Sequence, residues 1–407
     1  MQVDPPNQLS TIQSMQRRGW RLRNGIAIAL WVVVAALAVV VVMRLVAWDD
    51  FEVFAILNCL TAFVYLPAWI VVVVAGLSRR LFLTGAALLI VAAQLAFLLP
   101  ELSAAQPVPA WAAQTPTLRI LDANVYNENR SMAGYASQVS TARPQLVTME
   151  EANPIDVAQL KMAGAFADLP YQFEVKFAFF VASRYPLSGT RVVYLYGRPL
   201  IVQTTLELPW GQQSLWVVHT IAPLPASFSR WQGQLALIGR LLRARGPKGL
   251  LIVGDFNATW GSRGFRGILD AGVTDAAAAR GRALDMTWSQ IMSFLPPLVR
   301  IDHVLTGPSL AARRSGQGTV QGATIETSSL QSRSSTRCRR ALRADGRRWG
   351  LQSGTVRQKR GESRVGVRRC RPSVSVEYLS RASRDRGPLS CPQSCPSAGA
   401  PLGTLRR

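Results

Sequence analysis

The chain has 407 residues and a formal net charge of +23 at pH 7. The charge is concentrated at one end, because the last 97 residues alone hold 21 of the 46 basic residues and only five acidic ones, so it does not describe the rest of the chain. No cysteine occurs between residues 101 and 310, which excludes a disulfide-stabilised scaffold for that part of the chain.

Three long apolar runs occupy the first hundred residues. Residues 25–43 contain no charge, residues 51–77 are apolar apart from Glu52 and Asn58 near one end, and residues 81–99 precede Pro100. Each run is long enough to cross about 30 Å of hydrocarbon. The first run also fits a signal peptide, but two further runs follow it, so cleavage would not release a soluble protein. We therefore predict three transmembrane helices within residues 25–100.

The arginines around these runs predict their orientation. Four arginines lie between residues 17 and 23, and Arg79 with Arg80 fill the turn between the second and third runs, whereas the loop after the first run is acidic. By the positive-inside rule, residues 1–24 and the second turn are cytoplasmic. A multi-pass protein of the cell membrane with an extracytoplasmic domain from residue 101 onward is expected. Residues 101–116, rich in Ala, Pro and Gln, are predicted to be a linker that holds this domain away from the bilayer.

Three apolar segments after the linker have the composition of buried strands that end in polar residues. Residues 118–127 contain Asn124, and residues 145–152 end in Glu150, Glu151 and an alanine. Residues 215–223 carry His219, one of only two histidines in the chain. Polar side chains at the ends of several strands are typical of a site rather than of a core.

Residues 227–245 have the pattern of an amphipathic helix. Trp231, Leu235, Ile238 and Leu242 recur at helical spacing on one face. A serine at 227 or 229 is expected to cap the start of the helix, and Gly-Pro-Lys-Gly ends it. We predict a helix packed on a sheet, without a cofactor role for its tryptophan.

Residues 249–258 have the sequence Gly-Leu-Leu-Ile-Val-Gly-Asp-Phe-Asn-Ala. We predict that they form a buried strand that ends in an acid and an amide. Gly254 lets the backbone turn, so that Asp255 and Asn257 project to the same side. Such a pair suits phosphate ester chemistry, in which one group positions water and the other binds a phosphate oxygen. Residues 300–307 then place Asp302 beside His303 on a further strand. Five strands thus present the polar residues that a divalent-metal phosphodiesterase needs.

The order of these motifs resembles the endonuclease/exonuclease/phosphatase superfamily over roughly residues 117–307, and in particular its membrane-anchored bacterial members. The matching motifs also include Ser-Arg-Tyr-Pro at 183–186 and Thr-Trp at 287–288. The resemblance implies an α/β fold of the deoxyribonuclease I type, a four-layer sandwich of two β-sheets flanked by helices. It also implies a phosphoric ester hydrolase acting as a phosphodiesterase, nuclease or phosphatase.

The family's roles carry over to matching residues. Asn124 and Glu151 resemble the metal-side pair, with Glu151 the carboxylate ligand of Mg²⁺ or Mn²⁺, whereas Glu150 occupies a position where Gln is usual. His219 resembles the histidine that binds the phosphate or protonates the leaving group.

Three further residues resemble catalytic groups of the family. Asp255 resembles the acid that orients or deprotonates the attacking water, and Asn257 resembles its phosphate-binding neighbour. Asp302 resembles the acid that orients a general-base histidine. The substrate stays open among nucleic acid, a phospholipid head group and an inositol or sugar phosphate, and no protein partner is evident.

The chain departs from the family at its last motif. The superfamily ends its site with a Ser-Asp-His segment, but both histidines of this chain lie earlier. His303 is a poor substitute, because the neighbour of Asp302 on a strand points to the opposite face. The alternative function is therefore a catalytically impaired or inactive membrane-tethered domain.

Residues 311–407 form a basic segment without sustained periodicity, rich in Ser, Gly and Pro, for which disorder is expected. One explanation is an out-of-frame translation, because the unusual composition begins where the last catalytic segment is due. The other is a basic arm that binds nucleic acid or anionic lipid. We expect the folded domain to end near residue 310, and to leave an apolar sheet edge exposed.

Overall fold

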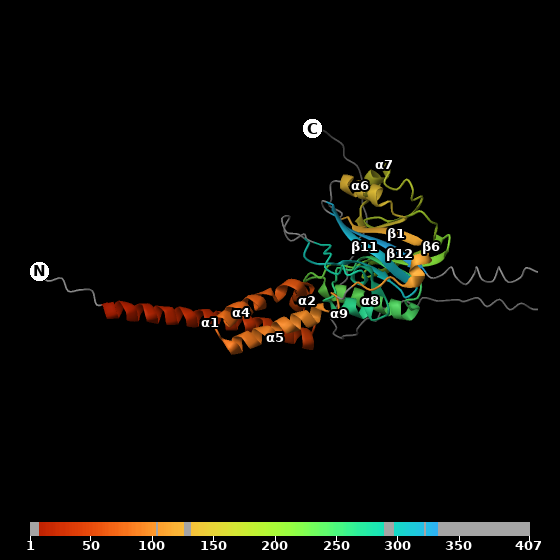
Figure 1. Ribbon diagram of the computed structural model, residues 1–407. Helices are drawn as coiled ribbons and strands as arrows, with labels where there is room; N and C mark the ends of the chain where they lie inside the picture. Colours follow the sequence, from red (N-terminus) through yellow and green to blue (C-terminus); the bar gives the residue numbers. More distant parts are fainter. Residues whose placement is uncertain (1–7, 103–104, 126–131, 289–296, 321–322, 333–407) are drawn as a thin grey trace, which may run out of the picture. The chain divides into compact units, whose positions relative to one another are not determined.

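A computed structural model of the chain describes residues 8–102, 105–125, 132–288, 297–320 and 323–332 (Figure 1). The amino-terminal part is helical and the remainder contains two β-sheets with helices outside them. The predicted α/β sandwich is confirmed.

The amino-terminal helices only partly match the predicted spans. Their bounds are α1 Gln8–Val46, α2 Glu52–Cys59, α3 Thr61–Val64, α4 Leu66–Leu77 and α5 Leu81–Leu98. Two stretches, Trp20–Val46 and Leu81–Leu98, are each long and apolar enough to cross a membrane. The second predicted span is instead bent by 81° at its break, so that the described helices supply two crossings, or three if the bent pair is one span.

A polar cluster accounts for the bend. The Arg44 guanidinium donates to the side-chain oxygens of Asn58 and Thr61, each at 3.1 Å, and all three residues are buried. Pro67 is the second residue of the following helix, in the first turn, where its missing N–H costs no hydrogen bond. The chain therefore changes direction where polar residues interrupt the apolar run.

Two six-stranded sheets form the domain that follows. The first sheet has the strand order β11-β12-β1-β2-β4-β3 and the second β5-β6-β7-β8-β10-β9. The strands of the first sheet are β1 Thr117–Asn124, β2 Leu146–Ala152, β3 Tyr171–Val175, β4 Ala178–Ser183, β11 Leu310–Val320 and β12 Ala323–Ser332. The strands of the second sheet are β5 Leu187–Leu195, β6 Arg198–Leu208, β7 Gly211–His219, β8 Leu250–Asp255, β9 Thr274–Asp275 and β10 Asp302–Thr306.

Helices cover the outer face of each sheet, which gives four layers. Helices α6 (Ala133–Ala142) and α7 (Pro154–Met162) pack on the first sheet, and α8 (Phe228–Arg245) and α9 (Arg263–Leu269) pack on the second (Figure 1). Alternate strand residues from both sheets form the central layer of apolar side chains. Two short helices, Ala110–Gln114 (3-10) and α10 (Ala276–Ala279), complete the domain.

Helix α8 confirms the sequence pattern. Trp231, Leu235, Ile238 and Leu242 are buried against the second sheet. The expected serine cap is absent, because the Ser227 hydroxyl donates to the Ala222 carbonyl instead.

Gly254 is required for a different reason from the predicted turn. Its φ is +127°, and a Cβ at this position would lie 2.1 Å from the Val218 carbonyl oxygen of β7. The glycine thus permits close approach of β7 and β8 just before Asp255.

The first sheet continues past residue 310, where we expected the folded domain to end. Strand β12 pairs antiparallel with β1, from Thr117↔Gln331 to Asp122↔Glu326, and β11 pairs with β12. Edge β1 is therefore covered rather than exposed. The rest of the basic segment, residues 333–407, lies outside the described residues.

Part of the predicted linker lies on the domain. The Gln106 amide donates to the Ala279 carbonyl at 3.0 Å, and Arg280 donates to the Gln106 carbonyl. These bonds tie the linker to α10, so it is not a free spacer along its whole length.

Candidate active site

The predicted site residues come from the same ends of neighbouring strands. Parallel strands β1 and β2 place Asn124 opposite Glu150, next to Glu151. Parallel strands β7 and β8 place His219 opposite Asp255, and antiparallel β10 places Asp302 on the other side of Asp255. Carboxyl ends of parallel strands are where α/β proteins assemble sites.

Asn124 joins the two sheets. Its Nδ2 donates to Oε1 of Glu151 at 3.1 Å and to Oδ2 of Asp255 at 2.9 Å. His219 lies on the same carboxylate, with 3.5 Å between its Nε2 and Glu151 Oε1. The structure thus brings four of the predicted residues into one cluster.

The backbone at Glu151 is strained in a way that directs its side chain. Its φ is +53°, and the pairing of β2 with β4 shifts register between Glu150 and Ala152. A non-glycine residue in this region costs on the order of 1 kcal/mol or more, and a bulge re-aims a side chain. Because of the bulge, the Glu151 side chain points in a different direction from the buried Glu150 side chain.

His219 is held mainly by its surroundings. Phe179 meets the imidazole edge-on, with ring centroids 6.3 Å apart. Burial lowers the pKa of His219, the Glu151 carboxylate opposes that effect, and the charge of Arg198 adds to it. A neutral imidazole can donate or accept a proton near neutral pH.

Asp255 is fixed from both sides. Its Oδ1 accepts the Asn257 backbone N–H at 2.7 Å, and its Oδ2 accepts from Asn124. Burial raises the pKa of Asp255 well above its usual value, the neighbouring Asp302 adds to this, and the hydrogen bond from Asn124 opposes it. The Asn257 side chain donates to the Thr220 carbonyl at 2.8 Å, so it also holds the loop after β7.

Asp302 is buried and incompletely bonded. Its backbone N–H donates to Thr287 Oγ1 at 3.2 Å, yet its Oδ1 has no hydrogen-bond partner among the described residues. Burial raises the pKa of Asp302 to about 6, whereas Thr287 and Arg300 oppose the rise. This unbonded Oδ1 belongs to Asp302, the acid that the family resemblance pairs with a general-base histidine.

His303 is a buried residue of the hydrophobic core. It is fully buried, with Nε2 donating to the Ala258 carbonyl at 2.9 Å and Nδ1 2.8 Å from Asp275 Oδ2. Its ring packs against Phe256 and Phe265. The expectation that it points away from the Asp302 side of the strand agrees with these contacts.

Asp122 is a buried acid beside the site that was not predicted from the sequence. Asp122 is fully buried and accepts the Thr148 hydroxyl, and burial raises its pKa to about 8. Burial, followed by the nearby Asp122, likewise raises the pKa of Glu150 well above its usual value. This shift favours the neutral form of the Glu150 carboxyl over the charged form. The signal was available, because Asp122 lies two residues before Asn124 on the same strand face.

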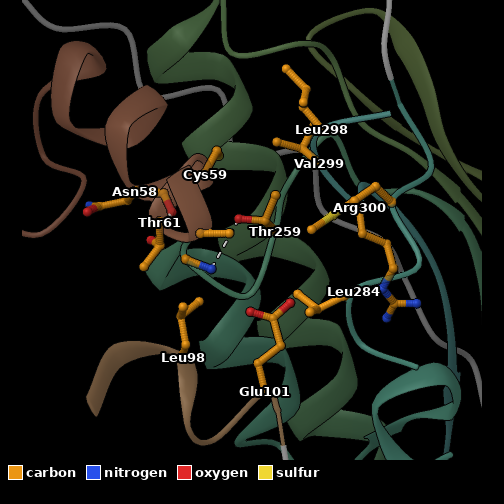
Figure 2. Close-up of a pocket in the computed structure, with 13 residues that line it drawn as sticks. Asn58, Cys59, Thr61, Leu98, Glu101, Thr259, Leu284, Leu298, Val299 and Arg300 are labelled. Carbon is orange, nitrogen blue, oxygen red and sulfur yellow. Dashed lines mark hydrogen bonds between the residues drawn. The ribbon is translucent and has the colours of Figure 1, made fainter. Parts of the chain in front are cut away.

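A separate pocket lies away from this cluster (Figure 2). It is lined by residues that include Asn58, Thr61, Glu101, Thr259 and Arg300, and by none of the predicted site residues. Figure 2 shows the Glu101 carboxylate pointing into it. Burial raises the pKa of Glu101 to about 7, with the Arg300 charge opposing the rise.

The sequence profile of the Endonuclease/Exonuclease/phosphatase family matches residues 123–335, which is more than half of the chain. The chain belongs to this family. Membership in the Endonuclease/Exonuclease/phosphatase family supports phosphoester hydrolysis in general terms. No curated protein matches the chain in sequence.

Solved structures of the family are similar to this chain. A humanized D. rerio TDP2 has a TM-score of 0.45 and 13% identity, covering 53% of this chain and 99% of that chain. An endonuclease/exonuclease/phosphatase from Beutenbergia cavernae DSM 12333 has a TM-score of 0.40 and 16% identity, covering 53% and 72%. A variant of the 3' phosphatase NExo from Neisseria, bound to a product DNA hairpin, has a TM-score of 0.41 and 15% identity, covering 52% and 98%.

Proposed function

We propose that this chain is a membrane-anchored, divalent-metal-dependent phosphoester hydrolase whose catalytic domain lies outside the cytoplasm. The observation that carries the proposal is the bridge that Asn124 makes between Glu151 on one sheet and Asp255 on the other. It places a carboxylate, an amide and a second acid beside His219, the set that such hydrolysis needs.

The donor set fits Mg²⁺ or Mn²⁺. Glu151 and Asn124 would hold the ion through carboxylate and amide oxygens, which hard cations prefer. Among the described residues, no three His, Cys, Asp or Glu side chains are arranged as a metal cage. Mg²⁺ sites commonly use one or two carboxylates together with water and substrate phosphate. A bound ion would supply charge to the phosphate and so favour attack at phosphorus.

Asp255, His219 and Asn257 are proposed to orient water, transfer a proton and bind phosphate. Asp255 has both carboxylate oxygens fixed by Asn124 and Asn257, so it can orient a water molecule for attack. His219 can hydrogen-bond the phosphate or give a proton to the leaving oxygen. Asn257 is proposed to bind phosphate with the amide that also contacts the loop after β7.

A second candidate function is a domain of impaired activity. It is favoured by Asp302 Oδ1, a buried acceptor without a described partner. An unsatisfied buried acceptor costs about 1–3 kcal/mol, so such an atom ordinarily has a donor. We propose that a reading-frame change between the codons for Ile301 and Leu330 removed the histidine that would donate. Resequencing that finds one intact frame, without an alternative encoding Ser-Asp-His, would contradict this.

Membrane anchoring rests on the apolar helices and the distribution of arginines. Arg80 donates to the Arg23 carbonyl at 3.0 Å, so the two basic segments lie at the same end of the helical bundle. We propose that this end is cytoplasmic, as the positive-inside rule requires.

Hydrolysis of an activated phosphodiester by the purified full chain tests the function. We expect activity with Mg²⁺ or Mn²⁺ that chelation abolishes, and a loss of about 10²-fold in His219→Ala. Asp168→Ala is the matched control, because its side chain is 83% exposed and forms an ion pair with Arg184 at 3.6 Å, away from the predicted site residues. Hydrolysis that resists chelation, or equal losses in both variants, would refute the proposal.

A further inference from the structure

The loop after the first apolar helix is joined to the catalytic domain beside the catalytic strand. Trp48 Nε1 donates to the Gly261 carbonyl at 2.8 Å, and Asp49 Oδ2 accepts the Arg263 backbone N–H at 2.8 Å. The contact is close, since a Cβ on Gly261 would lie 2.0 Å from the Asn58 carbonyl oxygen. Asp49 is 4% exposed. This junction includes Asn58 and Thr259, which both line the pocket drawn in Figure 2.

Trp48 indicates where this junction lies relative to the membrane surface. It follows directly after the span Trp20–Val46, and tryptophan is enriched where hydrocarbon meets water. Because its indole N–H is bonded to Gly261, the loop after β8 lies at the membrane surface. Gly261 is only six residues beyond Asp255. This placement requires the bent helix pair to cross the membrane, because with two crossings residues 101 onward would emerge on the side opposite Trp48.

The hairpin of β5 and β6 lies beside the site and is linked to this junction through α8. Gln232 on α8 donates to the Asp49 carbonyl at 2.9 Å. The next residue, Gly233, lies under the Tyr196 hydroxyl, which would be 2.4 Å from a Cβ there. Tyr196 belongs to the turn between β5 and β6, and its neighbour Arg198 is among the charges that act on His219.

The exposed side chains of this region are suited to a lipid surface. Tyr194 and Tyr196 are 58% and 54% exposed, and Leu224, in the loop after His219, is 62% exposed. Tyrosine places an apolar ring beside a polar hydroxyl and is favoured at membrane interfaces. Arg198 supplies the positive charge that an anionic head group requires.

We infer that the site faces the surface of the membrane that anchors the chain, and that its substrate is a phosphoester in a lipid head group. The hairpin residues Tyr194, Tyr196 and Arg198 contact the interface. The inference rests on the proposed function. Water adds to phosphorus, the P–O bond to the head-group or glycerol alcohol breaks, and that alcohol leaves with a proton.

Depth-dependent fluorescence quenching tests the placement without requiring activity. The full chain, with its five native cysteines replaced by serine, receives a polarity-sensitive label through Tyr196→Cys or Leu224→Cys and is reconstituted in vesicles containing doxyl-labelled lipid. Met162→Cys is the control, because Met162 is 81% exposed on α7, over the other sheet. We expect several-fold stronger quenching at 196 and 224 than at 162. Equal quenching at all three positions would overturn the inference.

Paired rate measurements test the substrate. The reconstituted full chain is supplied with bis(p-nitrophenyl) phosphate in solution and with phosphatidylglycerol, phosphatidylethanolamine and phosphatidic acid in the vesicles. We expect Tyr196→Ser to lower the ratio of lipid to soluble hydrolysis about tenfold. Tyr171→Ser, at a tyrosine 43% exposed on β3, should leave this ratio unchanged. Hydrolysis of the soluble ester without any of the lipids would overturn the inference and leave the proposed function standing. Hydrolysis of neither would refute the proposed function itself.

Discussion

Gly254→Ala is expected to disrupt the strand that carries Asp255. The new methyl group would lie 2.1 Å from the Val218 carbonyl oxygen, 2.9 Å from its nitrogen and 3.0 Å from its carbonyl carbon. Relief of this overlap requires β7 and β8 to separate by roughly 1 Å, since ordinary contacts begin near 3.5 Å. Val218 and Gly254 are partners in the ladder that also pairs His219 with Asp255, so the separation would spread into the site.

The expected loss of stability is the sum of a backbone-strain cost and the cost of a weakened hydrogen bond. A non-glycine residue at a φ of +127° costs about 1–3 kcal/mol, and weakening a buried ladder bond costs about 1–3 kcal/mol more. We therefore expect the free energy of unfolding to fall by about 2–6 kcal/mol. For a domain of this size the melting temperature should fall by about 10 °C.

Thermal unfolding of the full chain in detergent, followed by tryptophan fluorescence, measures this fall. Gly267→Ala is the matched control, because Gly267 lies in α9 with nothing within 4 Å of its added Cβ. That variant should gain up to about 1 kcal/mol from helix propensity. If Gly254→Ala melted at the wild-type temperature and kept its activity, the close approach of β7 and β8 would not be needed to form the site.

Further predictions concern charge, chemistry and topology. The folded-state pKa of Glu101 is raised from 4.5 to about 7, so its stabilising effect is present below about pH 4.5 and is lost as the pH rises to about 7. Glu101→Gln should therefore raise the melting temperature at pH 8 and change it little at pH 4, and the reverse order would contradict this. Asp255→Asn should lower phosphodiester hydrolysis by about 10²-fold while the melting temperature changes much less, because removing a charge that burial disfavours offsets the loss of one of the two N–H bonds that the carboxylate accepts. An equal loss of folding would show that the residue acts structurally. In intact cells, a cysteine at Gln106 should react with a membrane-impermeant maleimide and one at Ser78 should not, and the opposite pattern would reverse the proposed orientation.

Much of the site could be predicted because apolar runs that end in polar residues mark strand ends. Asn124, Glu151, His219 and Asp255 lie on four different strands, yet hydrogen bonds, the 3.5 Å contact between His219 and Glu151, and strand register bring them together. Strand patterns identify the ends, and parallel pairing places those ends at one edge. The bridge by Asn124 between sheets could not be predicted, because sheet stacking is set by contacts far apart in sequence.

Other features depended on interactions that carry no local pattern. The bend in the second apolar run depends on Arg44, which reaches Asn58 and Thr61 from another helix. Strands β11 and β12 lack apolar alternation, but backbone hydrogen bonds pair β12 with β1 without requiring it. The sequence places Asp122 on the same strand face as Asn124, but its burial follows only when both sheets are in place.

Manganese binding measured by titration calorimetry on the full chain tests the central claim most directly. The account predicts that wild type and Asp168→Ala bind Mn²⁺, and that Glu151→Ala loses this binding together with phosphodiester hydrolysis, because one carboxylate ligand is removed from a site of few ligands. Wild-type Mn²⁺ affinity in Glu151→Ala would contradict it.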